Sequence, residues 1–375
     1  RFNADTHGHS APHVEAVVAN ARALGEIAGD HGRVLAVVKA DAYGHGAVEV
    51  GRALVERAGI RGLAVSLVEE GFELRAAGLR GPILVLGGVY AGAHRAVLEA
   101  ELTPVVSEAR DLEAFAAAAR ARGAPAAVHI KVDTGMARLG VQLAALPALL
   151  EVCAARPEIK VVGLCTHLAC ADAADPEPTI KQLGLLEAAR TLLAAHGIAP
   201  LVHAANTAAT IRFPAACLGA VRPGIGLYGG GGAVPGLLKP VMRLVTAIAQ
   251  LRTLLPGDPV SYGALWRANG RARIATLPVG YADGYPRRLT GRAEVLVGGK
   301  RCAVVGAICM DMTMVDVTAL GEQVAVGDDV VLLGGQAEEQ ITAAELAGLA
   351  GLIEYEIFCG IAKRVPRVWM SGEGR

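Results

Sequence analysis

The 375-residue sequence lacks an excess of either charge and lacks long hydrophobic runs, and each absence excludes a class of protein. Lys plus Arg and Asp plus Glu both number 36. Because neither sign forms a long block, composition gives no argument for nucleic acid or a membrane surface as the partner. No apolar stretch reaches the roughly 18 residues of a transmembrane helix, and the polar opening RFNADTHGHS does not resemble a signal peptide. We therefore expect a small-molecule partner.

The cysteines also lack a pattern. The seven Cys are scattered and form no CxxC pair or other zinc-like spacing. An odd number of scattered thiols favours reduced cysteines over a disulfide framework. We therefore expect a cytoplasmic enzyme with no metal site, in which most thiols are small core residues.

Short runs rich in Val, Ile and Leu alternate with Ala-rich segments of helical length between about residues 30 and 225. The eight runs are residues 34–39, 62–66, 83–86, 103–106, 126–131, 161–166, 200–204 and 219–222. A helix is expected beside each run, beginning with residues 12–29 ahead of the first. This repetition predicts a parallel sheet, and eight strand–helix units predict an α/β fold of the TIM-type (β/α)8 barrel.

The cluster GGGGAVPG after Tyr228 is the best candidate for a linker, because Gly and Pro disfavour helix and strand. We expect a barrel domain over residues 1–232 and a mostly β domain over residues 233–375. Alternating β-branched segments in the second domain are residues 241–251, 272–277, 293–297 and 330–333. One helix is expected over residues 342–352, with Thr342 as its N-cap and Glu345 three residues on.

Polar residues follow several of the eight runs. They are Lys39, Lys131, Asp133, Thr166, His167, Asn206, Thr207 and Arg222. Reactive groups of barrel enzymes lie at the carboxyl ends of the strands. We therefore expect these side chains to converge on one mouth of the barrel.

Lys39 ends the run AVVK and precedes the loop ADAYGHG, in which Gly44 and Gly46 permit close backbone approach. A desolvated lysine has a lowered pKa and is suited to Schiff-base chemistry. The alternative is a strand-end lysine that pairs with Asp41.

Arg222 opens RPGIGLYGG, where backbone N–H groups and a fixed positive charge suit a phosphate. Glycine-rich loops are weak signals alone. The alternative is a tight turn between strand and helix with a surface arginine.

Eight motifs in order identify a family. They are VVKADAYGHG, VHIKVDTGMARLG, GLCTHLA, HAANTAA, VRPGIGLYG, VSYGA, VGYADGYPR and AICMDMTMVDV. Together they resemble the alanine racemase family from about residue 34 to 369. The resemblance implies a barrel that binds pyridoxal 5'-phosphate (PLP), a C-terminal β domain, and racemisation of L- and D-alanine that supplies D-alanine for bacterial peptidoglycan.

The resemblance implies two opposing bases. Lys39 is similar to the lysine that binds PLP covalently and serves as base on one face of the substrate Cα. Tyr262, in VSYG, resembles the base on the other face, and racemisation needs both because one removes the proton and the other returns it. In the family this tyrosine comes from the partner subunit, so a homodimer with composite sites is implied.

The remaining implied roles concern the cofactor and the substrate. Arg222 resembles the arginine that faces the pyridine nitrogen, and His167 the histidine that bridges this arginine and the tyrosine. The other residues on the cofactor side are Tyr43, Asn206, Thr207, Gly224, Ile225 and Lys363. Residues that resemble substrate-side groups are Arg138, Tyr281, Met310 and Asp311. Lys131 resembles a lysine that is carbamylated in many members and then pairs with Arg138.

Three positions depart from the family pattern. The usual N-terminal strand, W-x-E-I-D-L, is replaced by RFNADTHGHSAPH, which puts its packing in doubt. Ala307 stands where Arg is common, and Lys363 where many members have Tyr. In the family both positions belong to the corridor through which substrate reaches the site, so we hypothesise an altered corridor with a broader substrate range. The alternative is neutral drift.

Other functions remain open at this stage. A racemase for serine or for several amino acids has the same motifs. A PLP-dependent decarboxylase of this architecture usually has a longer chain and a cysteine-bearing catalytic motif. A PLP carrier without turnover resembles an isolated barrel. Tyr262 is the residue that separates a racemase from the last two.

Overall fold

The computed structural model describes residues 9–10, 12–232, 234 and 236–369. The chain forms two compact units. The unit called here the barrel unit comprises Val17–Ala42 and Ala47–Lys239. The other, called the β unit, comprises Arg1–Ala16, Tyr43–Gly46 and Pro240–Arg375.

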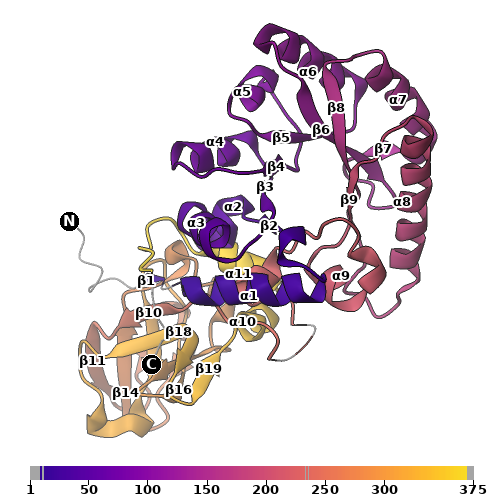
Figure 1. The fold of residues 1–375 in the computed structure, drawn as a ribbon. Coiled ribbons are helices and arrows are strands. Elements are labelled where there is room, and N and C mark those ends of the chain that lie inside the picture. Colours follow the sequence, from indigo (N-terminus) through magenta and orange to yellow (C-terminus); the bar gives the residue numbers. More distant parts are fainter. Residues whose placement is uncertain (1–8, 11, 233, 235, 370–375) are drawn as a thin grey trace. The chain divides into compact units, whose positions relative to one another are not determined.

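A curled parallel sheet forms the barrel unit (Figure 1). Its strands, in the order of pairing, are β2 (Leu35–Val37), β3 (Gly62–Val65), β4 (Ile83–Val85), β5 (Thr103–Val106), β6 (Ala126–Asp133), β8 (Ile159–Cys165) and β9 (Leu201–His203). β2, β3 and β4 are buried along their whole length, as expected for strands covered on both faces. These seven strands lie where seven of the eight apolar runs predict them.

The eighth run closes the barrel through isolated bridges. Ala220 bridges to His203 of β9, and Val221 bridges to Val34 next to β2. Leu35 N also donates to Val221 O at 2.9 Å. The segment therefore bonds to both edge strands, and the TIM-type barrel is confirmed with its eighth strand reduced to these bridges. One short strand, β7 (Val141–Gln142), pairs beside β6 and was not predicted.

Helices follow the strands as predicted. They are α1 (Val14–Ile27), α2 (Lys39–Gly44), α3 (Ala47–Arg57), α4 (Val68–Ala76), α5 (His94–Glu99), α6 (Ala109–Arg122), α7 (Leu146–Ala154), α8 (Glu177–Ala195) and α9 (Thr207–Arg212). The predicted helix over residues 12–29 is confirmed as α1. Gly123 ends α6 in the left-handed conformation, with φ 72°, which glycine adopts without steric cost.

A buried asparagine on α1 holds the chain that follows the Gly/Pro cluster. Asn20 is 1% exposed, and its amide donates to Leu227 O at 3.1 Å and Lys239 O at 2.8 Å. Its Oδ1 accepts from Lys239 N at 2.7 Å. All three bonds lie within the barrel unit, so Asn20 anchors the end of that unit to its first helix.

We expect Asn20→Ala to lower the free energy of unfolding by roughly 2–3 kcal/mol, because it leaves buried backbone groups without partners. Urea unfolding followed by circular dichroism measures the change. Asn269→Ala, at an exposed asparagine, is the matched control. Equal stability of the two variants would contradict this role.

The β unit is mostly β, as predicted. Its largest sheet contains β1 (His9–Ser10), β10 (Leu244–Ala247), β18 (Asp329–Gln336), β15 (Glu294–Val297), β16 (Lys300–Ala303) and β19 (Glu339–Ile341). The smaller sheets are β11 (Gln250–Leu254), β14 (Ala272–Leu277) and β17 (Thr313–Asp316), and the pair β12 (Pro259–Val260) and β13 (Trp266–Arg267). Two helices follow, α10 (Ala343–Ala350) and α11 (Glu354–Gly360).

The segments of the β unit differ from the expected ones in two places. The run 241–251 is two strands, because residues 244–247 pair with β18 in one sheet while residues 250–254 pair with β14 in another. Of the N-terminal segment whose packing was in doubt, His9 and Ser10 pair antiparallel with β10, while residues 1–8 and 11 lie outside the described residues. The expected N-cap is confirmed, with Thr342 Oγ1 accepting from Glu345 N at 3.1 Å, but α11 was not predicted.

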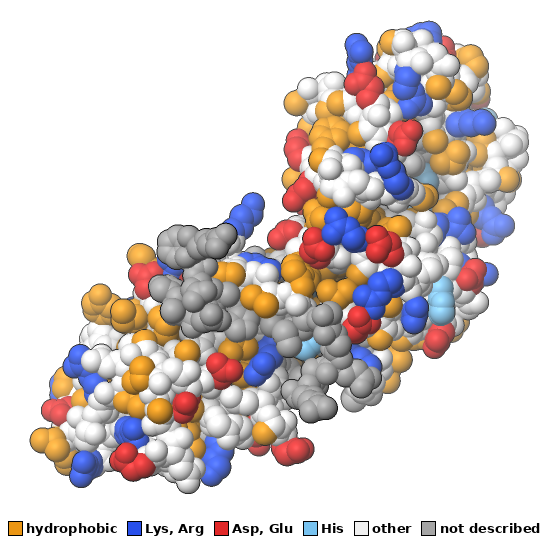
Figure 2. Space-filling view, turned by 60° about the vertical axis from the view of Figure 1, so that its left-hand side comes forward, with side chains coloured by type: hydrophobic (Ala, Val, Ile, Leu, Met, Phe, Trp, Pro, Cys, Tyr) orange, Lys and Arg blue, Asp and Glu red, His pale blue; other side chains and the backbone are white. Residues whose placement is uncertain are grey.

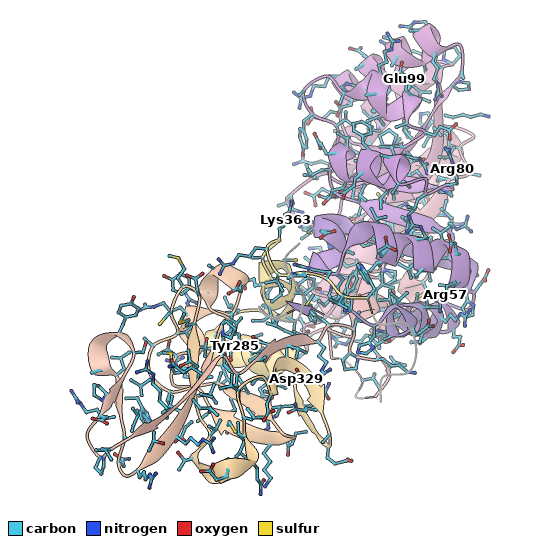
Figure 3. All side chains as sticks on the ribbon, turned by 90° about the vertical axis from the view of Figure 1, so that its left-hand side faces the viewer. Arg57, Arg80, Glu99, Tyr285, Asp329 and Lys363 are labelled. Carbon is cyan, nitrogen blue, oxygen red and sulfur yellow. The ribbon has the colours of Figure 1, made fainter. Side chains whose placement is uncertain are left out.

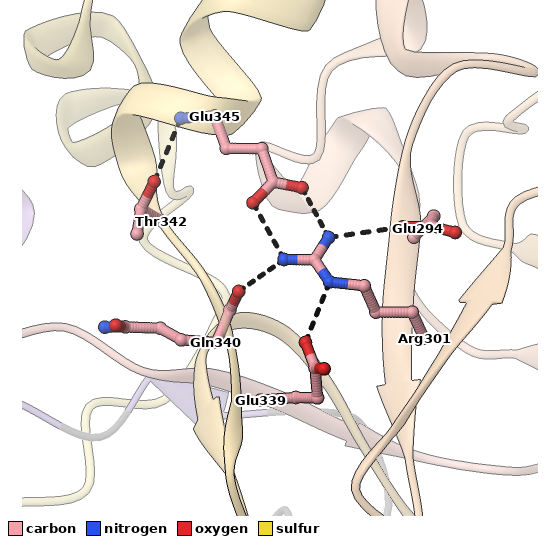
Figure 4. Close-up of polar contacts among 6 residues, drawn as sticks. All are labelled: Glu294, Arg301, Glu339, Gln340, Thr342 and Glu345. Atoms are coloured by element: carbon pink, nitrogen blue, oxygen red, sulfur yellow. Dashed lines mark hydrogen bonds and ion pairs between the residues drawn. The ribbon is translucent and has the colours of Figure 1, made fainter.

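Arg301 ties β16 to its neighbours in the β unit (Figure 4). Its guanidinium forms two bonds to Glu345, at 2.7 and 3.1 Å, one to Glu339 at 3.0 Å and one to Glu294 at 3.2 Å. It also donates to Gln340 O at 2.6 Å. These carboxylates raise the arginine's pKa above its ordinary value through their hydrogen bonds. One side chain thus joins β15, β16, β19 and the first turn of α10.

Tyr285 is buried in the β unit at 1% exposure, and its hydroxyl has no hydrogen-bond partner among the described residues (Figure 3). Burial, and then the charge of Glu345, raise the pKa of this phenol. The hydroxyl is therefore neutral, and no hydrogen bond offsets the free-energy cost of its desolvation.

We expect Tyr285→Phe to leave the free energy of unfolding unchanged or to raise it by about 1 kcal/mol, because the lost hydroxyl had no bond. Tyr228→Phe is the matched control. The buried Tyr228 hydroxyl donates to Val37 O at 3.0 Å, so its loss is expected to cost about 1–2 kcal/mol. Denaturant unfolding compares them, and a larger loss for Tyr285→Phe would overturn the interpretation.

The surface carries mixed charge. Figure 2 shows Lys and Arg side chains interspersed with Asp and Glu on the face it presents, which agrees with the balanced composition. Within the described ranges, no helix has both the length and the apolar character that crossing a bilayer requires. All seven cysteines are free thiols.

Candidate active site

Lys39 lies where β2 passes into α2, and α2 winds left-handed. Ala40, Asp41, Ala42 and Tyr43 have φ of 53–55°. A left-handed turn costs L-residues roughly 1–2 kcal/mol each, and such strain persists only where the surroundings fix it. The strained turn begins one residue after the predicted cofactor lysine.

Two carboxylates hold this turn. Glu70 Oε1 accepts from Ala40 N at 2.6 Å, and its Oε2 accepts from Ser66 N at 2.8 Å. Asp41 Oδ1 accepts from Ala47 N at 2.7 Å. The chain on both sides of the turn is therefore fixed within the barrel unit, which limits where Lys39 extends its amine.

Four basic residues of the barrel unit act on His167 through their charges. Burial is the largest cause that lowers its pKa, to about 3, followed by the charges of Arg222, Arg138, Lys131 and Lys39. The imidazole is consequently neutral at pH 7. Four of the residues predicted at the barrel mouth, together with the predicted substrate-side Arg138, thus lie within electrostatic reach of one another, and their positive charges attract an anion.

Arg222 is buried and fixed by carbonyl groups. Its Nη2 donates to Thr166 O at 2.6 Å and Ala204 O at 3.1 Å, and its Nη1 donates to His203 O at 2.8 Å. Burial lowers its pKa from the ordinary value. Among the described residues, Arg222 acts on His167 through its positive charge, and no hydrogen bond joins the two side chains.

Two histidines that sequence reasoning missed extend from Arg222. Arg222 Nη1 donates to His203 Nδ1, so the proton of His203 lies on Nε2, which contacts His129 Nδ1 at 2.8 Å. Burial first, and then Arg222, lower the pKa of His203 and that of His129, the latter to about 4. Gly163 makes room, because a Cβ there would lie 2.2 Å from the His129 ring.

The glycine-rich turn after Arg222 closes on α9. Thr207 Oγ1 accepts from Gly224 N and Gly226 N, both at 3.1 Å, and Ile225 is buried between them in sequence. Asn206 caps α9 by accepting from Ala209 N at 2.9 Å. Three predicted cofactor residues, Thr207, Gly224 and Ile225, thus share one turn, with Asn206 beside it.

Lys131 lies beside a cleft of about 350 Å³ at the ends of β4 and β5. Burial, and then the neighbouring Arg222 and Arg138, lower its pKa, while Cys165 and Asp133 act to raise it. Asp133 accepts from three backbone N–H groups that lower its pKa, although burial alone raises it. Lys131 is therefore a lysine whose neutral amine is more accessible than usual.

Three predicted residues of the β unit have exposed side chains. Tyr262 is 73% exposed, Met310 53% and Tyr281 41%. Tyr281 N donates to Cys309 O at 3.0 Å, which joins Tyr281 to the segment that carries Met310. Ser261 has φ 62° and ψ −174°, a glycine-type conformation that costs of order 1–3 kcal/mol.

Arg364 holds the predicted Asp311. Its Nη2 donates to Asp311 and its Nε to Asp283, both at 2.7 Å. Lys363 precedes it and is exposed (Figure 3). Asp311 is thus a partner of this arginine within its own chain.

Tyr43 belongs to the β unit although it follows Lys39 closely in sequence. Its ring lies 5.8 Å from that of Tyr355 between centroids, and burial raises its pKa. Gly44 has φ 79°, and a Cβ there would lie 2.4 Å from Phe358 O of α11. Only glycine therefore fits the close approach at Gly44.

A parallel barrel with a lysine after its first strand and an arginine in its eighth, together with a mostly β unit, defines a class of two-domain barrel enzymes. The N-terminal alanine racemase domain matches residues 13–231, and the C-terminal alanine racemase domain matches residues 241–369. The chain belongs to the alanine racemase family, whose members are PLP-dependent, and it is an amino-acid racemase.

Relatives and solved structures agree over nearly full length. Alanine racemase of Sorangium cellulosum is 46% identical over 90% of this chain and 91% of its own. The crystal structure of alanine racemase from Streptomyces lavendulae is 36% identical with a TM-score of 0.90, covering 98% of both chains. A structure from Bartonella henselae with covalently bound pyridoxal phosphate is 29% identical with a TM-score of 0.88, covering 97% of this chain and 100% of its own.

Proposed function

We propose that the protein racemises alanine with PLP as cofactor, using one base on each face of the substrate Cα. The observation that carries the proposal is the cluster of Lys39, Lys131, Arg138 and Arg222 around a neutral His167 in a barrel of this family. A cationic cluster with a lysine at the end of β2 suits an anionic aldehyde cofactor. When bound, PLP withdraws electrons from the substrate Cα and makes its proton removable.

The described residues fit the phosphate and the ring of PLP. The turn at Gly224 and Gly226 already presents backbone N–H groups to a hydroxyl oxygen of Thr207, which is the donor chemistry that phosphate needs. We assign the phosphate to this turn with Asn206, Ile225, Tyr43 and Lys363 as further contacts. Lys39 holds the cofactor covalently.

Arg222 is assigned to the pyridine nitrogen. A guanidinium does not give up its proton, so beside the bound cofactor Arg222 would donate a hydrogen bond to this nitrogen and leave it unprotonated. With the cofactor bound, this arrangement would favour return of the proton to the substrate Cα over transamination. Arg222 bonds to His203, which in turn bonds to His129, and these hydrogen bonds help to fix the orientation of the guanidinium. Both imidazoles are neutral.

Tyr262 is assigned as the second base, supplied by the partner subunit of a homodimer. Its exposure of 73% in its own chain supports a role completed by another subunit. Leu265, near Tyr262 in sequence, and Met312, elsewhere in the β unit, are also exposed apolar side chains. Lys39 and Tyr262 then remove and return the proton from opposite faces of the substrate Cα. His167 is assigned to the Lys39 side, near the basic residues that act on it.

Arg138, Tyr281, Met310 and Asp311 are assigned to the substrate carboxylate and its surroundings. The lowered pKa of Lys131 favours the neutral amine that carbamylation requires. A carbamate there carries a negative charge and pairs with Arg138, which orients the guanidinium toward the substrate. We further propose that the D-alanine supports peptidoglycan synthesis in the cytoplasm. We also propose that the domain boundary in the sequence lies at residues 232 and 233, within the Gly/Pro cluster, although the compact units divide after Lys239.

Reconstitution with PLP tests the proposal. The expected results are one cofactor per chain, with the absorbance of lysine-bound PLP, and conversion of L- to D-alanine followed by circular dichroism. Protein that holds PLP but leaves L-alanine optically unchanged would be evidence against racemisation.

We propose that Lys363 and Ala307 broaden the substrate range, because one adds a charge and the other removes one relative to the family pattern. Lys363→Tyr is expected to lower kcat/KM for serine or a longer amino acid relative to alanine by a few-fold, through about 1 kcal/mol of differential binding. Steady-state rates with alanine, serine and lysine measure the ratios. Lys300→Tyr, at another exposed lysine of the same unit, is the control, and unchanged ratios in Lys363→Tyr would refute the idea.

A further inference from the structure

Tyr262 is presented by a strained turn that its own side chain does not stabilise. Ser261, Gly263 and Ala264 all have positive φ, of 62°, 72° and 46°. The Tyr262 side chain is largely exposed. Its position therefore depends on how the backbone of the turn is held.

The turn has a rigid base. Val260 is 5% exposed and belongs to a buried cluster with Ala268, Ile274 and Val305. It pairs with Trp266 where β12 meets β13. Residues 261–265 are therefore fixed at both ends, while the turn that they form lies outside the buried cluster.

One hydroxyl joins the turn to a neighbouring segment. Ser261 Oγ donates to Ala307 O at 2.6 Å and lies 3.3 Å from Cys309 Sγ. Gly306 permits this approach, because a Cβ there would lie 2.6 Å from Val260 O and 3.0 Å from Ser261 Cβ. The bond uses the backbone of Ala307, so it does not depend on the side chain at that position.

The segment that accepts this bond also carries the substrate-side residues of the β unit. Cys309 O accepts from Tyr281 N, and Met310 O accepts from Ala282 N, both at 3.0 Å. The Ser261 hydroxyl therefore links the residue before Tyr262 to the backbone that holds Tyr281 and Met310.

We propose that Ser261 is a positioning residue for Tyr262: its bond to the Ala307 carbonyl holds the turn in the conformation that presents the phenol to the substrate. The inference rests on the proposed role of Tyr262 as second base. Ser261 touches neither substrate nor cofactor in this scheme, so its effect passes through Tyr262 alone.

A double-mutant cycle in the PLP-loaded protein tests the inference. Ser261→Ala is expected to slow α-proton exchange by about tenfold, since small misplacement of a catalytic group has effects of this size or larger. The slowing is expected for the enantiomer whose proton Tyr262 removes, with KM nearly unchanged. In a Tyr262→Phe background, Ser261→Ala is expected to have no further effect on either enantiomer.

Two companion variants separate positioning from folding. Ser261→Gly adopts a positive φ without steric cost but lacks the hydroxyl, so it is expected to fold and to slow the same enantiomer. Ser261→Cys keeps a weak donor and is expected to recover part of the rate. Thr318→Ala, whose hydroxyl contacts Asp316 and Arg273 in the same unit, is the control. Hydrogen exchange of residues 261–265 in the PLP-free protein is expected to quicken in Ser261→Ala and Ser261→Gly.

The outcomes are distinguishable. A slowing by Ser261→Ala that persists undiminished in the Tyr262→Phe background overturns the inference alone, as does a normal rate in Ser261→Gly. If Tyr262→Phe itself leaves exchange of both enantiomers unchanged, the assignment of the second base and the inference both fail.

Discussion

Replacing Lys39 by alanine is expected to abolish the absorbance of lysine-bound PLP and to reduce racemisation by on the order of 10³-fold or more, because one side chain serves as covalent anchor and as base. The left-handed turn after Lys39 rests on Glu70 and Asp41. Since these bonds do not involve the lysine amine, the barrel is expected to remain folded. Absorbance of the PLP-treated protein and circular dichroism of alanine measure both effects.

The matched control is Lys160→Ala, at an exposed lysine of β8 in the same unit. It is expected to retain cofactor and activity. If Lys39→Ala kept the lysine-bound spectrum, another lysine would hold PLP, and Lys131 would be the first to examine because its pKa is lowered.

Tyr262→Phe is expected to bind PLP normally yet to slow racemisation by on the order of 10²–10⁴-fold, the usual contribution of a general base. The phenol hydroxyl is the only group removed, and the side chain packs little within its own chain. Exchange of the α-proton is expected to fail for one enantiomer and to persist for the other. Separate measurements on L- and D-alanine in D₂O show this asymmetry.

Tyr90→Phe provides the control for Tyr262→Phe, because Tyr90 is also exposed and its hydroxyl donates only to Gly87 O in the described structure. Its exchange rates are expected to match those of the wild type. Racemisation at the normal rate in Tyr262→Phe would disprove the two-base assignment.

The barrel was predictable because its strands are continuous apolar runs. Burial on both faces demands such runs, and glycines and polar residues mark their ends. The position of the eighth strand was predicted correctly, but the strand is shorter than expected. Its residues close the sheet through single bridges to β9 and to Val34 next to β2. The helix α11 was missed, because its seven residues, EYEIFCG, are too few for a clear helical period.

The site was predictable only in part. Lys39 and Arg222 stand at strand ends, where position alone left a structural role open and the family motifs were needed to assign a function. His203 and His129 were missed because they lie within the strands, where a histidine usually reads as a core residue. The feature that could have revealed them is the pairing of His129 with Gly163 on the adjacent strand, where the missing side chain leaves room for the imidazole. This pairing can be recognised only when the register of the strands is known. The left-handed conformation of Ala40 to Tyr43 had no signal, since three of these residues are ordinary L-residues with little tendency toward positive φ.

Exchange of the α-proton in D₂O, with L- and D-forms of alanine, serine and a longer amino acid, tests the central claim most directly. In protein shown to hold PLP by its absorbance, the account predicts deuterium at Cα of both alanine enantiomers and interconversion of the two. Absence of exchange with every amino acid of the panel, in protein that holds the cofactor, would contradict it.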